Sequence, residues 1–492
     1  MTGGLMQLVA YGAQDIYLTG NPMITYFKVV YRRHTNFAME SIEQTFNGEA
    51  DLGTNVSAII SRNGDLINGI YLQTTLPNLS GTGNGGQARW VDNVGHFLIS
   101  QVSIEIGGQT IDTHYGDWLE IWSQLTVPAG QKVGYLEMIG QDQVDTFGRL
   151  TGLQAETLGN NGLIPGRTIY VPLQFWFCRN IGLALPLIAL QYHEVKINMV
   201  FNVLSNLTQG NDPAAVNPQR GTTILSNTSL WVDYIFLDTE ERRRFAQITH
   251  EYLIEQIQLT QANITCDNTR VLSSNNPPST ITVRLNFNHP VKELIWVIKN
   301  NNPAFNRPSQ PANYTSVASI DTIAQTAIGS IGNLPAGGSG NGGLSKQSDL
   351  LELIGQGSIN PPGALNPVIT AQLLLNGHDR FSTRIGDYFN LYQTVRHHTC
   401  APESPGINVY SFALFPEQHQ PSGTCNFSRI DNAYLVLTAA IYVGATGDIS
   451  NYPGIHDTQQ TYPNGNSVIS VYAVNYNVLR ITNGMGGIAY NN

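Results

Sequence analysis

The chain has 492 residues, only 12% of them charged, and a formal net charge of −10 at pH 7. This length is enough for two or three domains with substantial cores, and the acidic balance argues against a protein that wraps directly around nucleic acid phosphates. The four cysteines lie far apart, which excludes a disulfide-rich scaffold and fits a reducing compartment. So low a charged fraction also suggests that neighbouring molecules cover much of the surface.

Residues 1–30 show no clear domain pattern, and we expect them to form an arm that docks on the body of the protein or on a neighbour. The first five residues lack the basic region and the apolar stretch of a signal peptide. The longest apolar run, 181–190, is interrupted by Gly182 and Pro186 and is too short to span a bilayer. We therefore expect neither a leader nor a membrane anchor.

From Phe37 onward, short apolar runs alternate with turn dipeptides such as Asn47-Gly48 and Gly107-Gly108. The 48 glycines and 24 prolines fit such turn-rich β structure. Because the strands do not alternate with helices, the pattern predicts sandwiches or barrels rather than a parallel sheet. The strands expected in the first half are 42–46, 57–61, 67–74, 97–106, 170–173, 175–177, 195–201 and 231–237.

A charged run at 240–245, with two glutamates and three arginines, interrupts the β pattern and predicts a helical turn between two domains. Residues 300–365 are rich in Asn, Pro, Gly and Ser, and a loop of that length indicates a surface insertion with a function or a disordered segment. The expected parts are an arm (1–30), a first domain (31–240), a junction (241–250) and a second domain (251–492), whose strands fall at 252–259, 281–287, 291–298, 371–375, 409–414, 434–437, 467–474 and 476–481.

The sequence around Gly108 recurs in altered form around Gly377. In both places an apolar run ends in a glycine turn, and a Gly-Asp-aromatic motif then opens an amphipathic segment, at Gly116 and at Gly386. The two offsets are 269 and 270 residues, close to half the chain length. This spacing indicates two similar domains rather than a short-period solenoid.

Several stretches, in one order from end to end, match a known family. They are 7–21, 29–37, 61–67, 182–196, 231–259, 285–290, 420–432 and 475–490, and the match departs mainly at 80–92, 125–165, 205–225 and 300–365, which are loop-like in composition. On these stretches the chain resembles the major capsid proteins of nucleocytoplasmic large DNA viruses, most nearly the phycodnavirus and chlorella-virus members.

The resemblance implies an all-β fold of two tandem eight-stranded jelly-roll β-sandwiches, a double jelly roll, with long surface loops and short helices. It implies a structural protein and not an enzyme, which trimerises into pseudo-hexameric capsomers that tile the icosahedral shell of a large DNA virus. The implied partners are the other copies of the homotrimer, neighbouring capsomers, minor capsid proteins and, indirectly, an inner viral membrane, with no direct contact to nucleic acid. The implied location is the capsid of the virion, assembled in the host cytoplasm.

Two alternatives stay open at this point. One is a carbohydrate-binding or host-attachment protein on a jelly-roll scaffold, which aromatic-lined exposed loops would favour, although the variable loops here are mostly Gly, Asn, Ser and Pro. The other is a less abundant minor capsid paralogue. A jelly-roll enzyme of the cupin type would need clustered His and Glu ligands, which the sequence does not display.

Two motifs of catalytic or nucleotide-binding proteins have little support here. Residues 81–86 satisfy the pattern G-x-G-x-x-G after a strand, but the phosphate-binding version needs a helix next, and Gln87-Ala88-Arg89-Trp90 does not begin one. No G-x-S-x-G elbow accompanies the many serines, histidines and aspartates. We expect a flexible loop at 81–86, no cofactor and no catalytic residue.

Histidines and cysteines late in the chain raise the alternative of a zinc site. Metal sites usually pair ligands at helix or knuckle spacing, and adjacent histidines in a strand point to opposite faces. We therefore expect ordinary loop and core positions and no metal. The residues concerned are His397, His398, Cys400, His419 and Cys425.

Two basic groups could bind an anionic partner. Tyr31, Arg32, Arg33 and His34 directly follow the arm, and we predict that they contact acidic minor capsid proteins or lipid headgroups on the inner side of the shell. The arginines at 242–244 lie beside two glutamates, so a salt-bridged junction between the domains is the preferred interpretation there.

Seven Asn-x-Ser/Thr sequons occur, and without a secretory signal most are expected to be chance matches. Asn426 lies in a strand-like motif and is expected to be buried. The glycosylation candidates are Asn313, in the long insertion, together with Asn78, Asn206 and Asn227.

Overall fold

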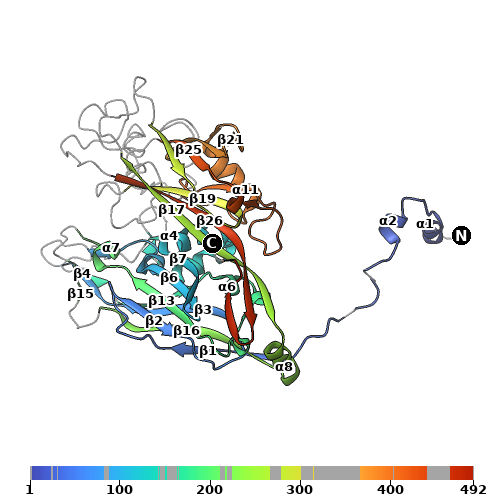
Figure 1. Ribbon diagram of the computed structural model, residues 1–492, viewed down its shortest axis with the longest axis horizontal. Helices are drawn as coiled ribbons and strands as arrows, with labels where there is room; N and C mark the ends of the chain where they lie inside the picture. The colour runs from blue at the N-terminus through green and yellow to red at the C-terminus, as the bar shows by residue number, and fades with distance from the viewer. Residues whose placement is uncertain are drawn as a thin grey trace, which may run out of the picture.

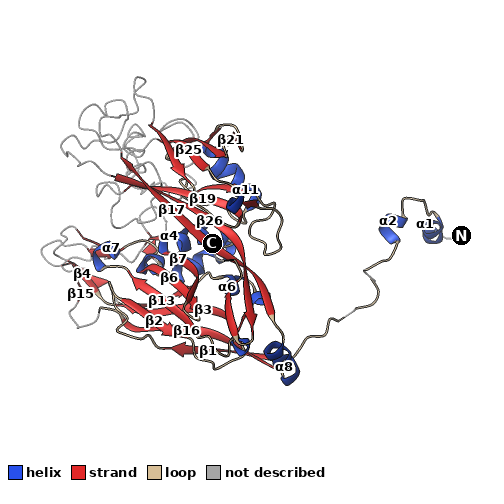
Figure 2. Cartoon of the chain, in the orientation of Figure 1, coloured by secondary structure: helices blue, strands red, loops and turns tan. Residues whose placement is uncertain are grey.

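Two antiparallel β-sandwiches make up the body of the protein in the computed structural model, and the N-terminal arm extends away from them (Figure 1). Strands dominate and the helices are short (Figure 2). No helix in the described ranges is both long and apolar enough to cross a membrane. The structure describes residues 3–23, 26–29, 31–81, 88–141, 143–144, 150–151, 163–164, 166–210, 216–218, 224–265, 279–300, 314, 366–402, 404–439 and 466–490.

The first sandwich consists of two facing sheets, each with four strands in one row, and β12 (Leu185–Pro186) pairs in addition with β3 of one sheet. Their strand orders are β1-β16-β3-β11 and β2-β13-β6-β7, with every neighbouring pair antiparallel. The chain passes back and forth between the two sheets in the order of a jelly roll. The strands are β1 (Phe37–Gln44), β2 (Asn55–Ile59), β3 (Leu66–Leu76), β6 (Ile99–Ile106), β7 (Gln109–Tyr115), β11 (Arg167–Pro172), β13 (Val195–Phe201) and β16 (Ser226–Leu237).

The second sandwich repeats this topology strand for strand. Its sheets have the orders β17-β26-β19-β23 and β18-β25-β20-β21, with β22 also paired to β20. The double jelly roll implied by the family resemblance is therefore confirmed. The strands are β17 (His250–Thr265), β18 (Ser279–Arg284), β19 (Pro290–Asn300), β20 (Val368–Leu375), β21 (His378–Asp379), β22 (Arg384–Ile385), β23 (Asn408–Ser411), β25 (Ala433–Ala439) and β26 (Asn466–Thr482).

Short elements fill the arm, the ends of the sandwiches and the connections. The helices are α1 (Gly3–Val9), α2 (Ile16–Thr19), α3 (Val94–Leu98), α4 (Gly116–Thr126), α5 (Ala129–Met138), α6 (Trp176–Arg179), α7 (Leu204–Leu207), α8 (Thr239–Gln247), α11 (Gln393–His397), the π-helical turn η3 (Tyr388–Tyr392) and the 3-10 turns η1 (Ile181–Leu183), η2 (Leu187–Ala189) and η4 (Phe427–Arg429). The minor strands are β4 (Leu79–Gly81), β5 (Ala88–Trp90), β8 (Gln143–Val144), β9 (Leu150–Thr151), β10 (Leu163–Ile164), β12 (Leu185–Pro186), β14 (Thr208–Gly210), β15 (Val216–Pro218), β24 (Cys425–Asn426) and β27 (Met485–Ile488).

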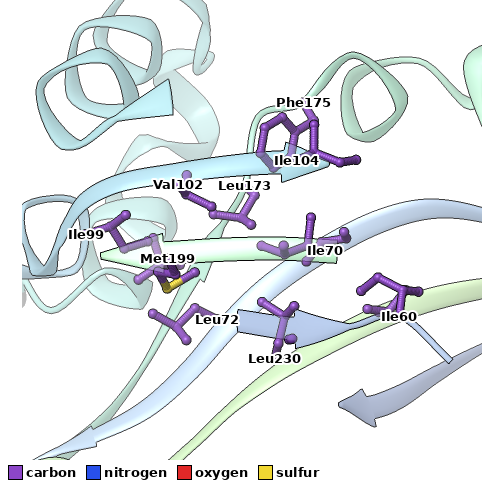
Figure 3. Close-up of a cluster of buried hydrophobic side chains, with 14 of the residues drawn as sticks. Ile60, Ile70, Leu72, Ile99, Val102, Ile104, Leu173, Phe175, Met199 and Leu230 are labelled. Carbon is purple, nitrogen blue, oxygen red and sulfur yellow. The ribbon is translucent and has the colours of Figure 1, made fainter. Parts of the chain in front are cut away.

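Strict alternation of apolar and polar residues builds each core. In β13 the residues Val195, Ile197 and Met199 are buried while Lys196 and Asn198 between them are half-buried. Figure 3 shows Met199 among side chains of both sheets, with Leu72 and Leu230 opposite. Each such side chain contributes about 1.5–3 kcal/mol through removal of its apolar surface from water.

The repeat seen in the sequence is one structural unit used twice. Gly107 and Gly108 join β6 to β7, and Asn376 and Gly377 join β20 to β21, all four with φ between +51° and +85°. Two-residue hairpins of this kind need a positive φ at both central residues, which explains the glycines and the asparagine. In both halves a helical segment follows, opened by the Gly-Asp-aromatic motif.

The glycine that opens each helical segment, Gly116 or Gly386, lies against the first residue of a strand of its own sandwich, β6 or β20. A Cβ on Gly116 would approach the carbonyl oxygen of Ile99 to 2.6 Å, and a Cβ on Gly386 would overlap the carbonyl oxygen of Val368. Ile99 begins β6 and Val368 begins β20, so the same close approach recurs.

The structure corrects three local predictions. Residues 175–177 do not form a strand, because β11 ends at Pro172 and α6 begins at Trp176; the three aromatic side chains are buried all the same, and a short apolar run does not distinguish strand from helix. Residues 97–98 belong to α3 rather than to the strand expected there. The two strands expected at 467–474 and 476–481 are one continuous strand, β26.

The described arm residues, 3–23 and 26–29, are exposed except for the half-buried Asp15, and α1 and α2 lie away from the body (Figure 1). The expected docking place of the arm is either the body of the protein or a neighbour. These residues do not dock on the body of their own chain. Apart from Asn300 and Tyr314, the insertion at 300–365 lies outside the described residues, as do most of the residues of the 81–86 loop.

We expect Gly116→Ala to lower the free energy of unfolding by about 2 kcal/mol, because the new methyl group would force the helix away from β6. Gly134→Ala is the matched control: Gly134 lies in α5 with open space around it, so alanine should raise stability by roughly 0.5–1 kcal/mol. Urea unfolding of the two variants measures both effects. Equal stability of both variants would contradict the assigned role of Gly116.

Candidate functional site

Helix α4 of the first sandwich packs on the outer face of the second. Trp118, Ile121, Trp122 and Leu125 recur at helical spacing on one side of α4, and each is at most 5% exposed. The ring of Trp118 lies 5.4 Å from that of Tyr472 in β26. The remaining residues of this cluster come mainly from β17, β19, β23 and β26: Ile257, Ile295, Val297, Tyr314, Ile407, Val409 and Val474.

This contact explains why the run from Val291 to Ile298 in β19 is buried without a break. Leu294 and Trp296 face the interior of the second sandwich, whereas Ile295 and Val297 face α4. A strand covered on both faces loses the alternation that a half-exposed strand shows.

Polar contacts fix both ends of α4. At its start, Asp117 accepts hydrogen bonds from Lys299 Nζ at 3.1 Å and from the Tyr314 hydroxyl at 3.0 Å. At its end, the backbone N–H of Cys400 donates to the carbonyl oxygen of Leu125 at 3.0 Å. The second sandwich thus satisfies a carbonyl group that the helix itself leaves without a partner.

The C-terminal hairpin of β26 and β27 returns to the first sandwich. The N–H of Tyr192 donates to the carbonyl oxygen of Gly484 at 2.9 Å, and the N–H of Ile488 donates to Gln109 Oε1 at 3.2 Å. Leu479 and Ile481 belong to the core cluster of the first sandwich. The two sandwiches are therefore interlocked from both directions.

A buried ion cluster joins the two sandwiches beside this hairpin. Glu255 of β17 lies 3.2 Å from Arg179 of α6 and 2.7 Å from Lys292 of β19, and the Lys292 side chain is fully buried. Burial alone would raise the pKa of Glu255, but the two cations outweigh it and lower the pKa. Removing one member of such a cluster typically costs about 3–5 kcal/mol, because the remaining charge stays buried without compensation.

His398 lies between two carboxylates. Its Nε2 is 3.0 Å from Glu293 and its Nδ1 is 2.9 Å from Glu417. Burial alone would lower the pKa of His398, but the two carboxylates outweigh it and raise the pKa to about 9. The imidazole is therefore a buried cation at neutral pH.

Besides His398, three of the residues weighed as zinc ligands have separate partners in the protein, and Cys425 is a free cysteine. His397 contacts the carbonyl oxygen of Leu414, Cys400 Sγ donates to the carbonyl oxygen of Val127, and His419 lies 4.0 Å from Glu255. Within the described residues, no group of three or more His, Cys, Asp or Glu side chains is arranged to hold a metal ion.

The basic residues at the root of the arm lie near α8. Tyr31, Arg32, Arg33 and His34 are exposed and precede β1, whose first residue pairs with Leu237, two residues before α8. The arm and α8 therefore leave the same end of the sheet. Their contact with a partner stays a prediction.

In α8, Arg242 pairs with buried Asp65 at 2.8 Å. Asp65 also accepts a hydrogen bond from the N–H of Leu237 at 2.9 Å. This ion pair favours the structural interpretation of the arginine run, but it ties α8 to the first sandwich rather than across to the second. Arg243 and Arg244 are exposed.

The glycosylation candidates remain untested. Asn78, Asn206 and Asn227 are exposed, although Asn78 Oδ1 accepts a hydrogen bond from the N–H of Gly166 at 2.5 Å. Asn313 lies outside the described residues. The prediction that Asn426 is buried is wrong: its strand has only two residues, and its exposed side chain accepts a hydrogen bond from the N–H of Ser428 at the start of η4.

Sequence reasoning did not identify the residues that join the sandwiches. The signals were present: two tryptophans four residues apart in α4, and Lys292-Glu293 inside an apolar strand. The first indicates a strongly apolar helix face and the second indicates buried charges that need partners. Neither signal says which surface supplies the partner.

Comparisons with known proteins cover the whole chain. Residues 25–238 match the family model of the major capsid protein N-terminus, and residues 241–487 match that of the large eukaryotic DNA virus major capsid protein. The major capsid proteins of Phaeocystis pouchetii virus and Paramecium bursaria Chlorella virus 1 are 46% and 43% identical, each over all of both chains. A quasi-atomic model of the PBCV-1 virus capsid matches with a TM-score of 0.69 and 38% identity, covering 95% of this chain and 100% of that one.

We expect the His398 contacts to make stability depend on pH. Because its pKa is raised from 6.5 to about 9, the stabilisation is complete below about pH 6.5 and is lost as the pH rises through 9, by roughly 3 kcal/mol in all. His398→Gln should be less stable than wild type at pH 6 and should lack this decline. Unfolding free energies from pH 6 to 10 test this, with His397→Gln as the neighbouring control; a decline that persists in His398→Gln would contradict the assignment.

Proposed function

Because this chain belongs to the family of major capsid proteins of large eukaryotic DNA viruses, we propose that it forms homotrimeric, pseudo-hexameric capsomers that tile an icosahedral shell. The coarser statement, that it is a capsid protein of the virion, rests on the family itself. The observation that carries the finer proposal is the identical strand order of the two sandwiches. Three copies would carry six similar sandwiches around one threefold axis.

The interlocked sandwiches support a role as a rigid building block. The α4 contact, the C-terminal hairpin and the buried ion cluster all cross between the sandwiches, so the chain presents them in one fixed relation. A lattice of pseudo-hexagonal units needs such a fixed relation, because each sandwich occupies one corner. The role needs packing rather than turnover, and we propose that the chain is not an enzyme.

We propose that the chain divides into the arm (1–30), the first jelly roll (31–240), the junction (241–250) and the second jelly roll (251–492). Support comes from the family matches, which meet between residues 238 and 241, and from α8, which lies between β16 and β17.

We also propose that the arm and the basic residues at its root face inward, toward minor capsid proteins or lipid headgroups. The exposed, apolar side chains of the arm support a partner outside the chain, since Leu8, Tyr17 and Phe27 are strongly exposed. The net charge of −10 supports the absence of direct contact with nucleic acid. Neighbouring capsomers would be the lateral partners, and assembly would take place in the host cytoplasm.

The purified chain should sediment at three times its mass of 53.9 kDa. A permanent trimer of this kind is expected to bury more than about 2,000 Å² per contact, so it should persist on dilution. Analytical ultracentrifugation at nanomolar to micromolar concentration measures this. A single-chain mass throughout that range would contradict the proposed capsomer.

Charge reversal at the root of the arm should weaken inner-face binding without affecting the trimer. Arg32→Glu with Arg33→Glu should reduce binding to phosphatidylserine vesicles by roughly tenfold or more, since each surface cation contributes about 1 kcal/mol near an anionic membrane. Arg284→Glu, at an exposed position in β18, is the control. Unchanged vesicle binding would argue against a membrane and leave acidic minor capsid proteins as the partner to be assayed by pull-down.

A further inference from the structure

The helical segment of the second sandwich carries apolar or aromatic residues at the positions that are apolar in α4. The offset of 270 residues in the repeat places Tyr388, Leu391, Tyr392 and Val395 at the positions of Trp118, Ile121, Trp122 and Leu125 in α4. Asp387 likewise falls at the position of Asp117. The segment runs through η3 and α11 and follows the same glycine, hairpin and sheet as α4 does.

The two helix faces differ in what covers them. The four residues of α4 are buried against the second sandwich, whereas Leu391, Tyr392 and Val395 are 54%, 59% and 68% exposed. An apolar stripe this exposed, at positions where the repeat buries its counterparts, indicates an interface with another molecule.

The receiving surface is repeated as well. Under α4, Leu259, Tyr472, Ile295 and Val409 stand opposite one another in a row across β17, β26, β19 and β23. The corresponding strands of the first sandwich are β1, β16, β3 and β11. Their equivalent row is Glu43, Trp231, Tyr71 and Pro172.

Two residues of this row, Trp231 and Tyr71, are aromatic, and Tyr170 of β11 lies beside Tyr71; these three residues are called the aromatic row below. Trp231 stacks on Tyr71 with ring centroids 6.2 Å apart, and Tyr170 lies 6.2 Å from Tyr71 on its other side. Tyr71 and Trp231 are partly exposed and Tyr170 is 40% exposed. Large aromatic side chains of this kind supply much of the binding energy at protein interfaces.

The charges around the two surfaces are complementary. Arg384 and Arg396 flank the helix stripe and are exposed, and the Arg384 guanidinium lies 4.8 Å from the ring of Tyr388. Glu43 of β1 lies opposite Trp231, and Asp233 lies two residues from Trp231 on the same face of β16.

The chain does not bring its own helix stripe to its own aromatic row. In Figure 1, α11 and the sheet of β1, β16 and β3 lie on opposite sides of the molecule. A second copy of the chain is the occupant that these observations favour. Its first sandwich carries the row equivalent to the one that α4 covers, and the acidic residues beside the aromatic row complement the arginines beside the helix stripe. A contact between two different patches of one chain is heterologous and closes into a ring when the rotation between copies allows it.

We propose that Leu391, Tyr392 and Val395 of one copy dock on the Tyr71–Trp231–Tyr170 row of the next. The contact that α4 makes within the chain is thereby repeated between chains, and a closed trimer contains six related helix–sheet contacts, three within and three between copies. This inference rests on the proposed capsomer and names the surfaces that hold it together.

The helix stripe is tested with Leu391→Asp combined with Val395→Asp. Both side chains are exposed, so the single chain should fold normally, which circular dichroism and thermal unfolding check. The concentration for half assembly should rise roughly 100-fold, the loss expected for an interface centre. Val133→Asp is the matched control, since Val133 is 63% exposed on helix α5 and lies outside both surfaces.

The receiving row is tested with Glu43→Arg combined with Tyr170→Arg, which places cations opposite Arg384 and Arg396. Neither the variant with Glu43→Arg and Tyr170→Arg nor the variant with Leu391→Asp and Val395→Asp should assemble alone. Mixed together, they retain one intact helix–sheet pair between them and should form a complex of two chains and no larger, as measured by light scattering after gel filtration.

The outcomes separate the inference from the proposed function. A wild-type trimer with dissociated variants and a two-chain mixture supports the inference. Three outcomes overturn the inference and leave the capsomer standing, provided that the wild-type chain is a trimer. The first is that either double variant still forms a trimer, and the second is that Val133→Asp dissociates as much as the double variants do. The third is that the two double variants do not pair when mixed. A wild-type chain that stays single overturns both.

Discussion

Burial of the apolar side of α4 against the outer face of the second sandwich determines how the two halves are placed. Each jelly roll has its own core, and the cores alone do not fix their relation. The contact of Trp118 with Tyr472, held in place by Asp117 at one end of the helix and by Cys400 at the other, fixes it. Once this contact is present, β19 is covered on both faces and the long strands β17 and β26 reach from one sandwich to the other.

Removing charged side chains from water costs free energy, and the charges buried near the contact between the sandwiches are each paired with an opposite one. Lys292, Glu293, Glu255 and His398 are withdrawn from water near the contact between the sandwiches, where each lies within 3.0 Å of an opposite charge. Apolar residues in the same space would avoid this penalty, whereas a buried charge that loses its partner strongly destabilises the fold. Of the pairs that these charges make, only that between Arg179 and Glu255 crosses between the sandwiches, so a displaced sandwich would leave the Arg179 guanidinium without its carboxylate partner.

Much of the fold could be predicted from the sequence, because alternation reveals a strand whenever only one of its faces is buried. The pattern at 195–201 gives β13 with its correct bounds, and the two glycine-containing turns indicate the duplication before any fold is known. Prediction failed where a segment is buried on all sides, as at 175–177, and where one strand serves two cores, as in β26. It also failed at Asn426, where a side chain–backbone hydrogen bond ends the strand. For the site, a sequence shows that a helix face is apolar but not which surface will cover it.

The central claim is that one helix–sheet contact is used twice, within the chain by α4 and between chains by the segment at 386–397. A cryo-electron microscopy map of the assembled capsomer tests it most directly, at the side chains of Leu391, Tyr392 and Val395. The account predicts that these three are buried on Trp231 and Tyr71 of the adjacent copy. A closed capsomer in which they face solvent, with the aromatic row uncovered or covered by another segment, would contradict it.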